Sequence, residues 1–153
     1  MRMIRGVEDA RSLLHKEIGR SGWQLVTQER INEFARATGD HQWIHVDVER
    51  AKAGPFGGPI AHGYLTLSLL PVLMAEVLDF EGASMMVNYG VNKVRFPASV
   101  PVDSSVRAII TLVDVADRGE GAADLVFAVQ IECDKRDRPV CVAETIVRAI
   151  WPA

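Results

Sequence analysis

The sequence has little cysteine and no stretch that resembles a secretion signal. Its 153 residues include two cysteines, Cys133 and Cys141, too few for a disulfide-stapled extracellular scaffold. The first 18 residues alternate charged with apolar side chains and hold no uninterrupted apolar core. We therefore expect a cytoplasmic protein in which both cysteines are reduced and buried as small apolar residues, with a contact between them across a hairpin as the alternative.

An excess of positive charge is also lacking. The chain carries 17 basic and 20 acidic residues, a net charge of −3, so no nucleic acid is expected as a partner. The longest run without charge, residues 53–75, contains four glycines and three prolines, and its continuous helical part has the length of a buried core helix. We therefore expect no membrane segment.

Internal repeats, low-complexity segments and domain linkers are missing from the sequence as well. Hydrophobic residues make up 48% of the chain and charged residues 24%, which is ordinary for a soluble globular protein. A chain of this length can bury a sizeable core, so we expect a single domain spanning residues 1–153.

The first half of the chain has helical signals. Apolar residues at helical spacing predict a helix over Val7–Ile18, and a short strand follows at Trp23–Val26. Thr27 is a good N-cap for a second helix that Gly39 ends. An irregular segment with one helical turn follows, and then a helix over Ala61–Leu78 that is apolar around nearly its whole circumference and that its internal proline should kink or break.

The second half of the chain is β-patterned. Alternating or β-branched residues predict four long strands, at Met85–Phe96, Val106–Val115, Ala123–Cys133 and Val140–Ile150. Four long strands and a short one around one apolar helix describe an α+β hotdog fold, an antiparallel sheet wrapped around a long central helix. Because exposed sheet edges are usually paired or covered, we predict a homodimer through the edge of the Val87–Phe96 strand, with the site near the interface.

An acid and a histidine follow the second helix. Asp40 and His45 lie five residues apart, and on one helix they would point about 140° away from each other, since each residue turns roughly 100°. Gly39 just before them permits a break, and a folded loop lets both side chains face one point. Either residue alone is better explained structurally, as a loop cap or a packed histidine.

These residues carry a family resemblance. The stretch resembles the signature of the MaoC-like, (R)-specific enoyl-CoA hydratase family, which it matches at Ala35, Thr38, Gly39, Asp40, Ile44, His45 and Asp47. The family's helix start appears as Pro59-Ile60-Ala61-His62-Gly63, and a later segment, Phe96–Asp103, is similar but lacks the family's glycine. Gln42 and Trp43 stand where the family usually has Asn and Pro, which puts substrate choice in question more than reaction type.

The resemblance implies a lyase that hydrates an enoyl thioester or dehydrates the 3-hydroxyacyl thioester. Asp40 and His45 would share the proton transfers, and the sequence does not decide which of them abstracts the proton from water. The backbone N–H of Gly63, at the start of the central helix, would hold the thioester oxygen, although helix packing also explains a glycine there. The substrate would be a thioester of coenzyme A or of acyl-carrier protein, and chain length and carrier both stay open.

Further candidates for contact with the substrate are Gln42, Trp43, His62, Tyr64, Ser68, Lys93 and Arg95. His62 is expected to orient the helix start rather than to react, and Ser68 can instead bond back to its own helix. Lys93 and Arg95 could meet coenzyme A phosphates, with a solvated strand face as the alternative.

Two other functions remain as alternatives. A hotdog acyl-CoA thioesterase would direct water at the carbonyl carbon, and a non-catalytic acyl-thioester-binding module would have no use for a paired acid and base. No cofactor beyond substrate coenzyme A is expected. No metal is expected either, because the histidines near Asp40 show no metal-ligand spacing.

Overall fold

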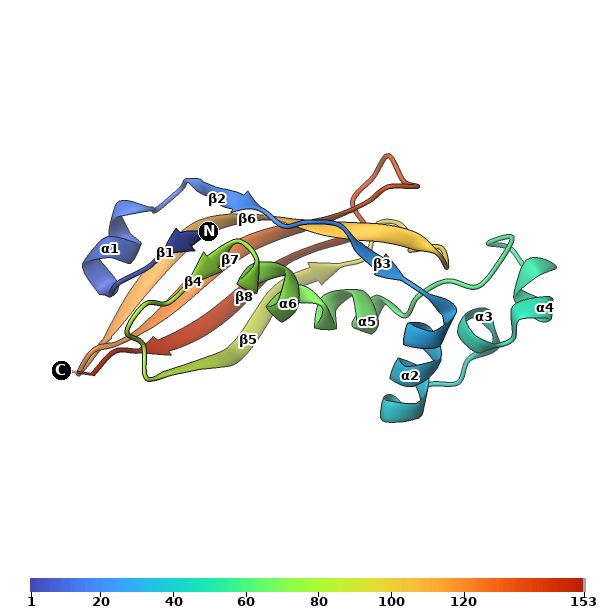
Figure 1. Ribbon diagram of the computed structural model, residues 1–153, viewed down its shortest axis with the longest axis horizontal. Coiled ribbons are helices and arrows are strands. Elements are labelled where there is room, and N and C mark those ends of the chain that lie inside the picture. The colour runs from blue at the N-terminus through green and yellow to red at the C-terminus, as the bar shows by residue number, and fades with distance from the viewer. Residues whose placement is uncertain (153) are drawn as a thin grey trace.

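Four long antiparallel strands form most of the sheet in the computed structural model, which describes residues 1–152 (Figure 1). Their bounds are Met85–Arg95 (β5), Ser104–Gly119 (β6), Ala122–Cys133 (β7) and Cys141–Ile150 (β8). The sheet order is β2-β6-β7-β8-β5, so β5 lies at an edge. All four predicted strands are confirmed. β6 runs further than expected because it stays paired with β7 up to a tight turn, where Glu120 and Gly121 both have positive φ.

Alternation along the strands places the core on one face of the sheet. Every second residue at the start of β6 and along β8 is buried, while the residues between them are partly exposed. Phe127 of β7 stands opposite Leu112 of β6 and Thr145 of β8, and all three are buried. This inner face holds the helices, and the opposite face carries most of the charged residues of the strands.

Two short strands, β2 (Glu17–Arg20) and β3 (Gln24–Val26), extend the sheet along β6. The prediction of a helix over Val7–Ile18 was wrong in its second half, since α1 covers only Val7–Ser12. His15, at φ 61°, turns the chain, and its N–H donates to the carbonyl of Leu112 at 2.7 Å. Pairing with the free edge of β6 thus replaces the last helical turn, a long-range effect that local spacing does not reveal.

The central helix is divided in two. α5 covers Gly63–Ser68 and α6 covers Leu70–Ala75, which confirms the predicted break near Pro71. Pro71 has no N–H to donate to the carbonyl one turn earlier. The predicted end at Leu78 was wrong, because Leu78–Asp79 form a strand (β4) that pairs in parallel with Arg2–Met3 (β1).

Both halves of the central helix lie along the inner face of the sheet (Figure 1). Leu65, Leu69 and Leu73 are buried against the sheet, whereas Tyr64 and Val72 are exposed. The helix is therefore covered on one flank and open on the other.

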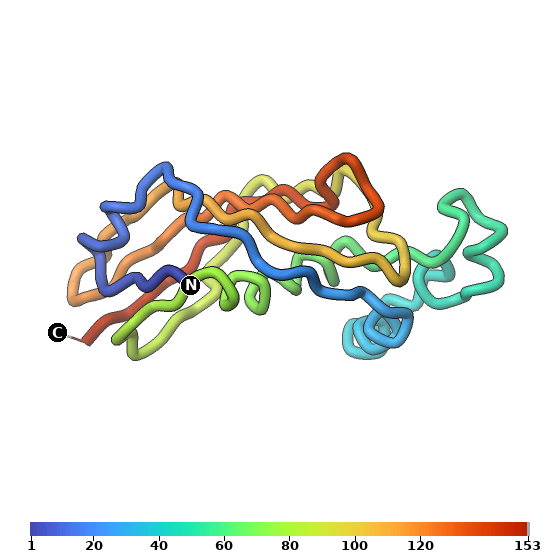
Figure 2. Tube along the Cα trace, turned by 45° about the horizontal axis from the view of Figure 1, so that its top comes forward, coloured from blue at the N-terminus to red at the C-terminus, as the bar shows by residue number. Residues whose placement is uncertain are grey.

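Three helices overhang the end of the sheet (Figures 1 and 2). They are α2 (Gln28–Thr38), α3 (Trp43–Val46) and α4 (Val48–Lys52). The predicted caps of α2 are confirmed: the Thr27 side chain accepts from the Arg30 N–H, and Gly39 ends the helix at φ 81°. Within residues 1–152, no helix combines the length and apolar character that crossing a membrane requires.

Candidate active site

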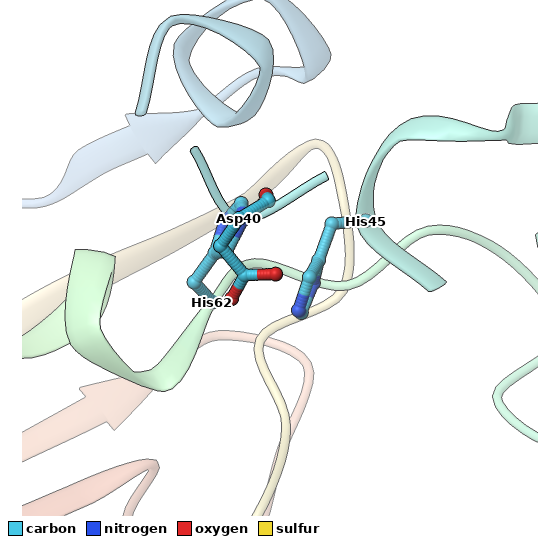
Figure 3. A group of neighbouring side chains, drawn as sticks. All are labelled: Asp40, His45 and His62. Atoms are coloured by element: carbon cyan, nitrogen blue, oxygen red, sulfur yellow. The ribbon is translucent and has the colours of Figure 1, made fainter. Parts of the chain in front are cut away.

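Asp40 and His45 meet although they belong to different elements. Gly39 ends α2 in a left-handed conformation, so the chain turns sharply at Asp40, whose Oδ1 accepts from the Gln42 N–H at 3.3 Å. The short helix α3 then carries His45 back toward Asp40. Figure 3 shows the Asp40 carboxylate directed toward the His45 ring. The pair thus faces one point because a loop, rather than a continuous helix, joins its two members.

His45 is held firmly and in one tautomer. Its side chain is buried, with 6% exposed, and its Nδ1 lies 2.6 Å from the carbonyl oxygen of Ile60. A carbonyl can only accept, so Nδ1 carries the hydrogen and Nε2 carries the free lone pair. Burial lowers the pKa of His45 below its ordinary value, an effect that the Ile60 carbonyl and Asp40 partly offset. Nε2 is therefore prepared to accept a proton.

His62 lies against both members of the pair. Its ring stacks on that of His45, with centroids 3.8 Å apart and planes 24° from parallel. Its Nε2 donates to the backbone oxygen of Asp40 at 2.9 Å, and Phe34 packs at 5.0 Å from its ring. With 2% of the residue exposed, His62 is a buried support and lies behind the pair rather than on the pocket wall.

A pocket of about 380 Å³ opens beside His45. Its lining is mostly apolar and comes from the end of α3, the start of α5, and the Phe96–Val100 segment after β5. Gly63 lines it, and a Cβ at this position would approach the Phe96 ring to 2.8 Å. Packing against Phe96 therefore requires glycine here, and the same lack of a side chain leaves the backbone open to the pocket.

Sequence reasoning missed several residues of this pocket. Phe56, Thr66 and Ser99 line it, but none of them was singled out from the sequence. Phe56 follows a glycine and a proline in the overhanging segment, and its aromatic ring in a glycine-rich loop was an available signal. Ser99 lies within the noted Phe96–Asp103 segment. Thr66 gave no signal in the sequence. In the structure its hydroxyl donates to the carbonyl of His62.

Asp40, His45 and His62 also form a group of metal-ligand type. Their donor atoms lie within 4.8 Å of one another, an arrangement that sequence spacing could not reveal because the three come from separate elements. One nitrogen of each histidine already donates to a backbone carbonyl, so each ring has a single nitrogen left to offer an ion.

Of the predicted residues, His45 and Gly63 line this pocket, Asp40 lies beside it against His45, and the others lie outside it. Gln42 is exposed and occupies the N-cap position of α3, where its side chain makes no capping hydrogen bond. Trp43 packs on Gly54 and under the guanidinium of Arg50, 4.4 Å from the ring centroid, so it stabilises the overhang. Tyr64 is exposed on α5, and the Ser68 hydroxyl donates to the Tyr64 carbonyl at 2.6 Å, as the back-bonding alternative predicted.

The two basic residues of β5 are engaged elsewhere. Lys93 pairs with Glu144 at 3.1 Å, and Arg95 donates to the carbonyl of Val94 at 2.7 Å. Asp47, which matches the family signature, caps α4 by accepting from the Arg50 N–H at 3.1 Å. The structure thus brings together Asp40, His45, His62 and Gly63, and leaves the remaining candidates at the periphery. Both cysteines are buried and free, and burial raises the pKa of the Cys141 thiol to about 11.

These features define a hotdog-fold protein with an acid–histidine site between its overhanging helices and the start of its central helix. Residues 9–129 match the family described as "MaoC like domain". Over 150 residues the chain is 50% identical to 3-hydroxyacyl-thioester dehydratase Z of Mycobacterium tuberculosis, covering 98% of this chain and 99% of that protein. The chain therefore belongs to the MaoC-like dehydratase family and is an enzyme.

Solved structures share the architecture. The monoamine oxidase regulatory protein of Archaeoglobus fulgidus superposes with a TM-score of 0.78 at 23% identity, covering 99% of this chain and 98% of that one. The unliganded R-hydratase of Pseudomonas aeruginosa superposes with a TM-score of 0.71 at 20% identity, covering 88% of this chain and 83% of that one. The predicted hotdog fold is confirmed.

Proposed function

We propose that the protein catalyses the reversible, (R)-specific hydration of trans-2-enoyl-CoA to (R)-3-hydroxyacyl-CoA. The observation that carries this proposal is that the Asp40 carboxylate and the His45 ring come together. A carboxylate oxygen of Asp40 and a ring nitrogen of His45 lie within 4.8 Å of each other. A single water can bridge two groups at this separation, since each hydrogen bond spans about 2.8 Å. The dehydratase of Mycobacterium tuberculosis, named for the same reaction in reverse, supports the assignment.

His45 is the better candidate to take the first proton. Its Nδ1 is committed to Ile60, so the free lone pair is on Nε2, and burial keeps the ring neutral to lower pH. As Nε2 accepts a proton from the water, the oxygen bonds to the β-carbon. The π electrons of the double bond move toward the thioester oxygen, and Asp40 orients the water from its other side. The pair then delivers a proton to the α-carbon, so both protons pass through one site.

Gly63 is proposed to stabilise the negative charge that develops on the thioester oxygen. It is the first residue of α5 and lines the pocket, where an N–H without an intrahelical partner can be directed at that oxygen. When the thioester oxygen of the substrate is bound to the Gly63 N–H, the β-carbon rather than the carbonyl carbon faces a water held by Asp40 and His45. This placement favours hydration over thioester hydrolysis.

A homodimer through the β5 edge is proposed as the active form. Strand β5 ends the sheet and exposes several apolar side chains: Met85, Met86, Val87, Tyr89 and Val91. The open flank of the central helix, with Tyr64 and Val72, lies on the same inner side and needs cover as well. Four of the predicted substrate contacts would then lie close to the dimer interface: Tyr64, Ser68, Lys93 and Arg95. They remain candidates for contact with the acyl chain, or with the coenzyme A or acyl-carrier protein that bears it. Gln42 and Trp43 of the overhang remain candidates as well. The free thiols agree with the proposed cytoplasmic location.

The test is an assay with a short trans-2-enoyl-CoA in which enoyl absorbance and free thiol are followed together. Hydration removes the conjugated double bond and leaves the thioester intact, so absorbance should fall while no thiol appears. Chiral analysis should give the (R)-3-hydroxyacyl product. Thiol release as fast as the loss of absorbance would indicate a thioesterase instead, and binding without turnover would indicate a binding module.

A further inference from the structure

One buried side chain, His62, contacts both members of the pair and has no role in the proton transfers described above. Its Nε2 donates to the Asp40 carbonyl at 2.9 Å, and its face stacks on His45 at 3.8 Å between centroids. Phe34, from α2, packs near the same ring. One imidazole therefore lies where the turn after α2, the helix α3 and the start of α5 come together.

The hydrogen bonds of Asp40 show how much this contact contributes. The Asp40 N–H donates to the Thr38 hydroxyl at 3.4 Å, and its carboxylate accepts from the Gln42 N–H at 3.3 Å, both longer than ordinary N–H···O bonds. The bond from His62, at 2.9 Å, is the shortest of the three and the only one of them that reaches outside the turn. It ties the exposed turn that carries Asp40 to the buried start of α5.

The tautomer of His62 follows from the same contact. The Asp40 carbonyl can only accept, so Nε2 carries the hydrogen and Nδ1 carries the lone pair. Nδ1 is buried and has no hydrogen-bond partner among residues 1–152. Leaving a buried polar atom unpartnered destabilises the folded state, so an apolar residue would suit this place better if packing were its only requirement. A histidine at this position is explained by two features together, the hydrogen-bond donor at Nε2 and the flat ring that stacks on His45.

We propose that His62 is a positioning residue that sets the separation of Asp40 and His45, holding the first by its Nε2–H and the second by its ring face. This inference rests on the proposed hydratase function, because it assumes that the pair performs the chemistry. His62 is buried and is not among the residues that line the pocket, so we assign it no contact with the substrate. Its effect should therefore appear in turnover and depend on the presence of Asp40.

Two substitutions separate the two contacts. His62→Phe keeps a flat ring against His45 and loses the donor to Asp40, whereas His62→Gln keeps an N–H at a similar reach and loses the ring. We expect His62→Phe to lower kcat by about 10- to 100-fold, the scale of a misplaced catalytic group, with KM changed less than about 3-fold. His62→Gln should retain more activity than His62→Phe. His15→Gln, at an exposed histidine far along the chain, is the control and should match the wild type.

A double-mutant cycle distinguishes positioning from general destabilisation. In an Asp40→Asn background, His62→Phe should change the residual turnover by less than about 3-fold, because the group it positions is already removed. A full and additive loss in that background would overturn the proposal. So would near-normal kcat for folded His62→Phe, with folding checked by circular dichroism and thermal melting.

Two measurements that need no substrate test this inference independently of the proposed function. Nitrogen-15 NMR of histidine-labelled protein should show His62 protonated at Nε2, and a proton at Nδ1 instead would overturn the inference. Hydrogen–deuterium exchange of residues 37–46 should speed up in His62→Phe and less in His62→Gln. If the wild type proves inactive on enoyl thioesters, the proposed function fails, while these two measurements still decide whether His62 holds the Asp40 turn.

Discussion

His45 donates its Nδ1 hydrogen to the backbone carbonyl of Ile60 across 2.6 Å, and this bond determines which of its nitrogens is free for chemistry. A histidine fixed in this way presents the lone pair of Nε2 in one direction. Ile60 precedes the start of α5 by three residues, so the bond also fixes the distance between the proposed base and Gly63.

The pair itself gives the first prediction. Asp40→Asn and His45→Ala should each lower kcat by about 100-fold or more, which is the usual contribution of a general acid or base. Asp40 is exposed, so its variant should melt close to the wild-type temperature, while loss of the buried His45 should also reduce stability. Steady-state kinetics on protein whose fold is verified makes the measurement, and near-normal turnover by either variant would leave that residue with a structural role only.

The pH dependence follows from burial of His45. A base must be neutral to accept a proton, so activity should fall as pH drops through the pKa of His45. Because burial lowers that pKa below 6.5, the acid limb of kcat/KM should lie below pH 6.5. A pH–rate profile checks this, and it should be unchanged in His15→Gln. A limb at or above pH 6.5 would contradict His45 as the neutral base.

Metal removal should leave the activity unchanged. The proposed chemistry uses side chains and backbone alone, and one nitrogen of each of His45 and His62 is already bonded to a backbone carbonyl. Dialysis against a chelator, followed by assay and elemental analysis, provides the measurement. Stoichiometric zinc that leaves the protein together with its activity would overturn this prediction.

The dimer should depend on β5. Val91 and Val142 are both exposed valines, at 47% and 40%, but Val91 lies on the edge strand and Val142 on its inner neighbour β8. Val91→Asp places a charge at the proposed interface and should shift the mass measured by light scattering from dimer toward monomer. Val142→Asp is the matched control and should remain dimeric. A wild-type protein that is a stable and active monomer would contradict the proposed assembly.

Asp124 should stabilise the fold outside the site. Its carboxylate is 4% exposed and accepts from Arg148 through two bonds of 2.6 and 2.8 Å and from Arg118 at 2.8 Å. The hydrogen bonds from Arg148 lower the pKa of Asp124 to about 2 from its ordinary 3.8, despite burial. Asp124→Asn should therefore lower the unfolding free energy at pH 7 by about 1–3 kcal/mol.

The same pKa shift fixes the pH window of this effect. A carboxylate whose pKa is depressed in the folded state contributes fully above 3.8, and the contribution disappears as pH falls through about 2. Urea titrations of wild type and Asp124→Asn should therefore converge toward pH 2. A constant difference across this range would show that the charge of Asp124 is not what stabilises the fold.

Local signals in the sequence were sufficient for much of the fold. Thr27 and Gly39 marked both ends of α2, and Pro71 marked the division of the central helix, because caps and proline act through their own neighbours. Strands β2 and β4 were missed because each exists through pairing with a distant segment, β6 in one case and the N-terminus in the other. Helical spacing at Ile18 and Leu78 cannot report such partners.

The candidate site also contains residues that the local sequence predicted and contacts that only the fold creates. The order of residues from Thr38 to His45 was enough to single out the acid and the histidine, since their chemistry depends on residue type and a permitted turn. The stacking of His62 on His45 joins residues 17 apart in the sequence, and only the folded overhang brings them into contact. Phe56 and Thr66 also reach the pocket only through the fold, although the aromatic ring of Phe56 in a glycine-rich loop was a local signal.

The peptide units around Ile60 connect the overhang to the sheet. Ile60 bonds through its N–H to the carbonyl of Ile44 at 3.1 Å and forms a β-bridge with Pro101, while the Ala61 N–H donates to Val100 at 2.8 Å. Pro101 and Val100 belong to the turn between β5 and β6, and Val100 also lines the pocket. Because the carbonyl of Ile60 also holds the imidazole of His45, only one or two peptide units separate this part of the pocket wall from the proposed base.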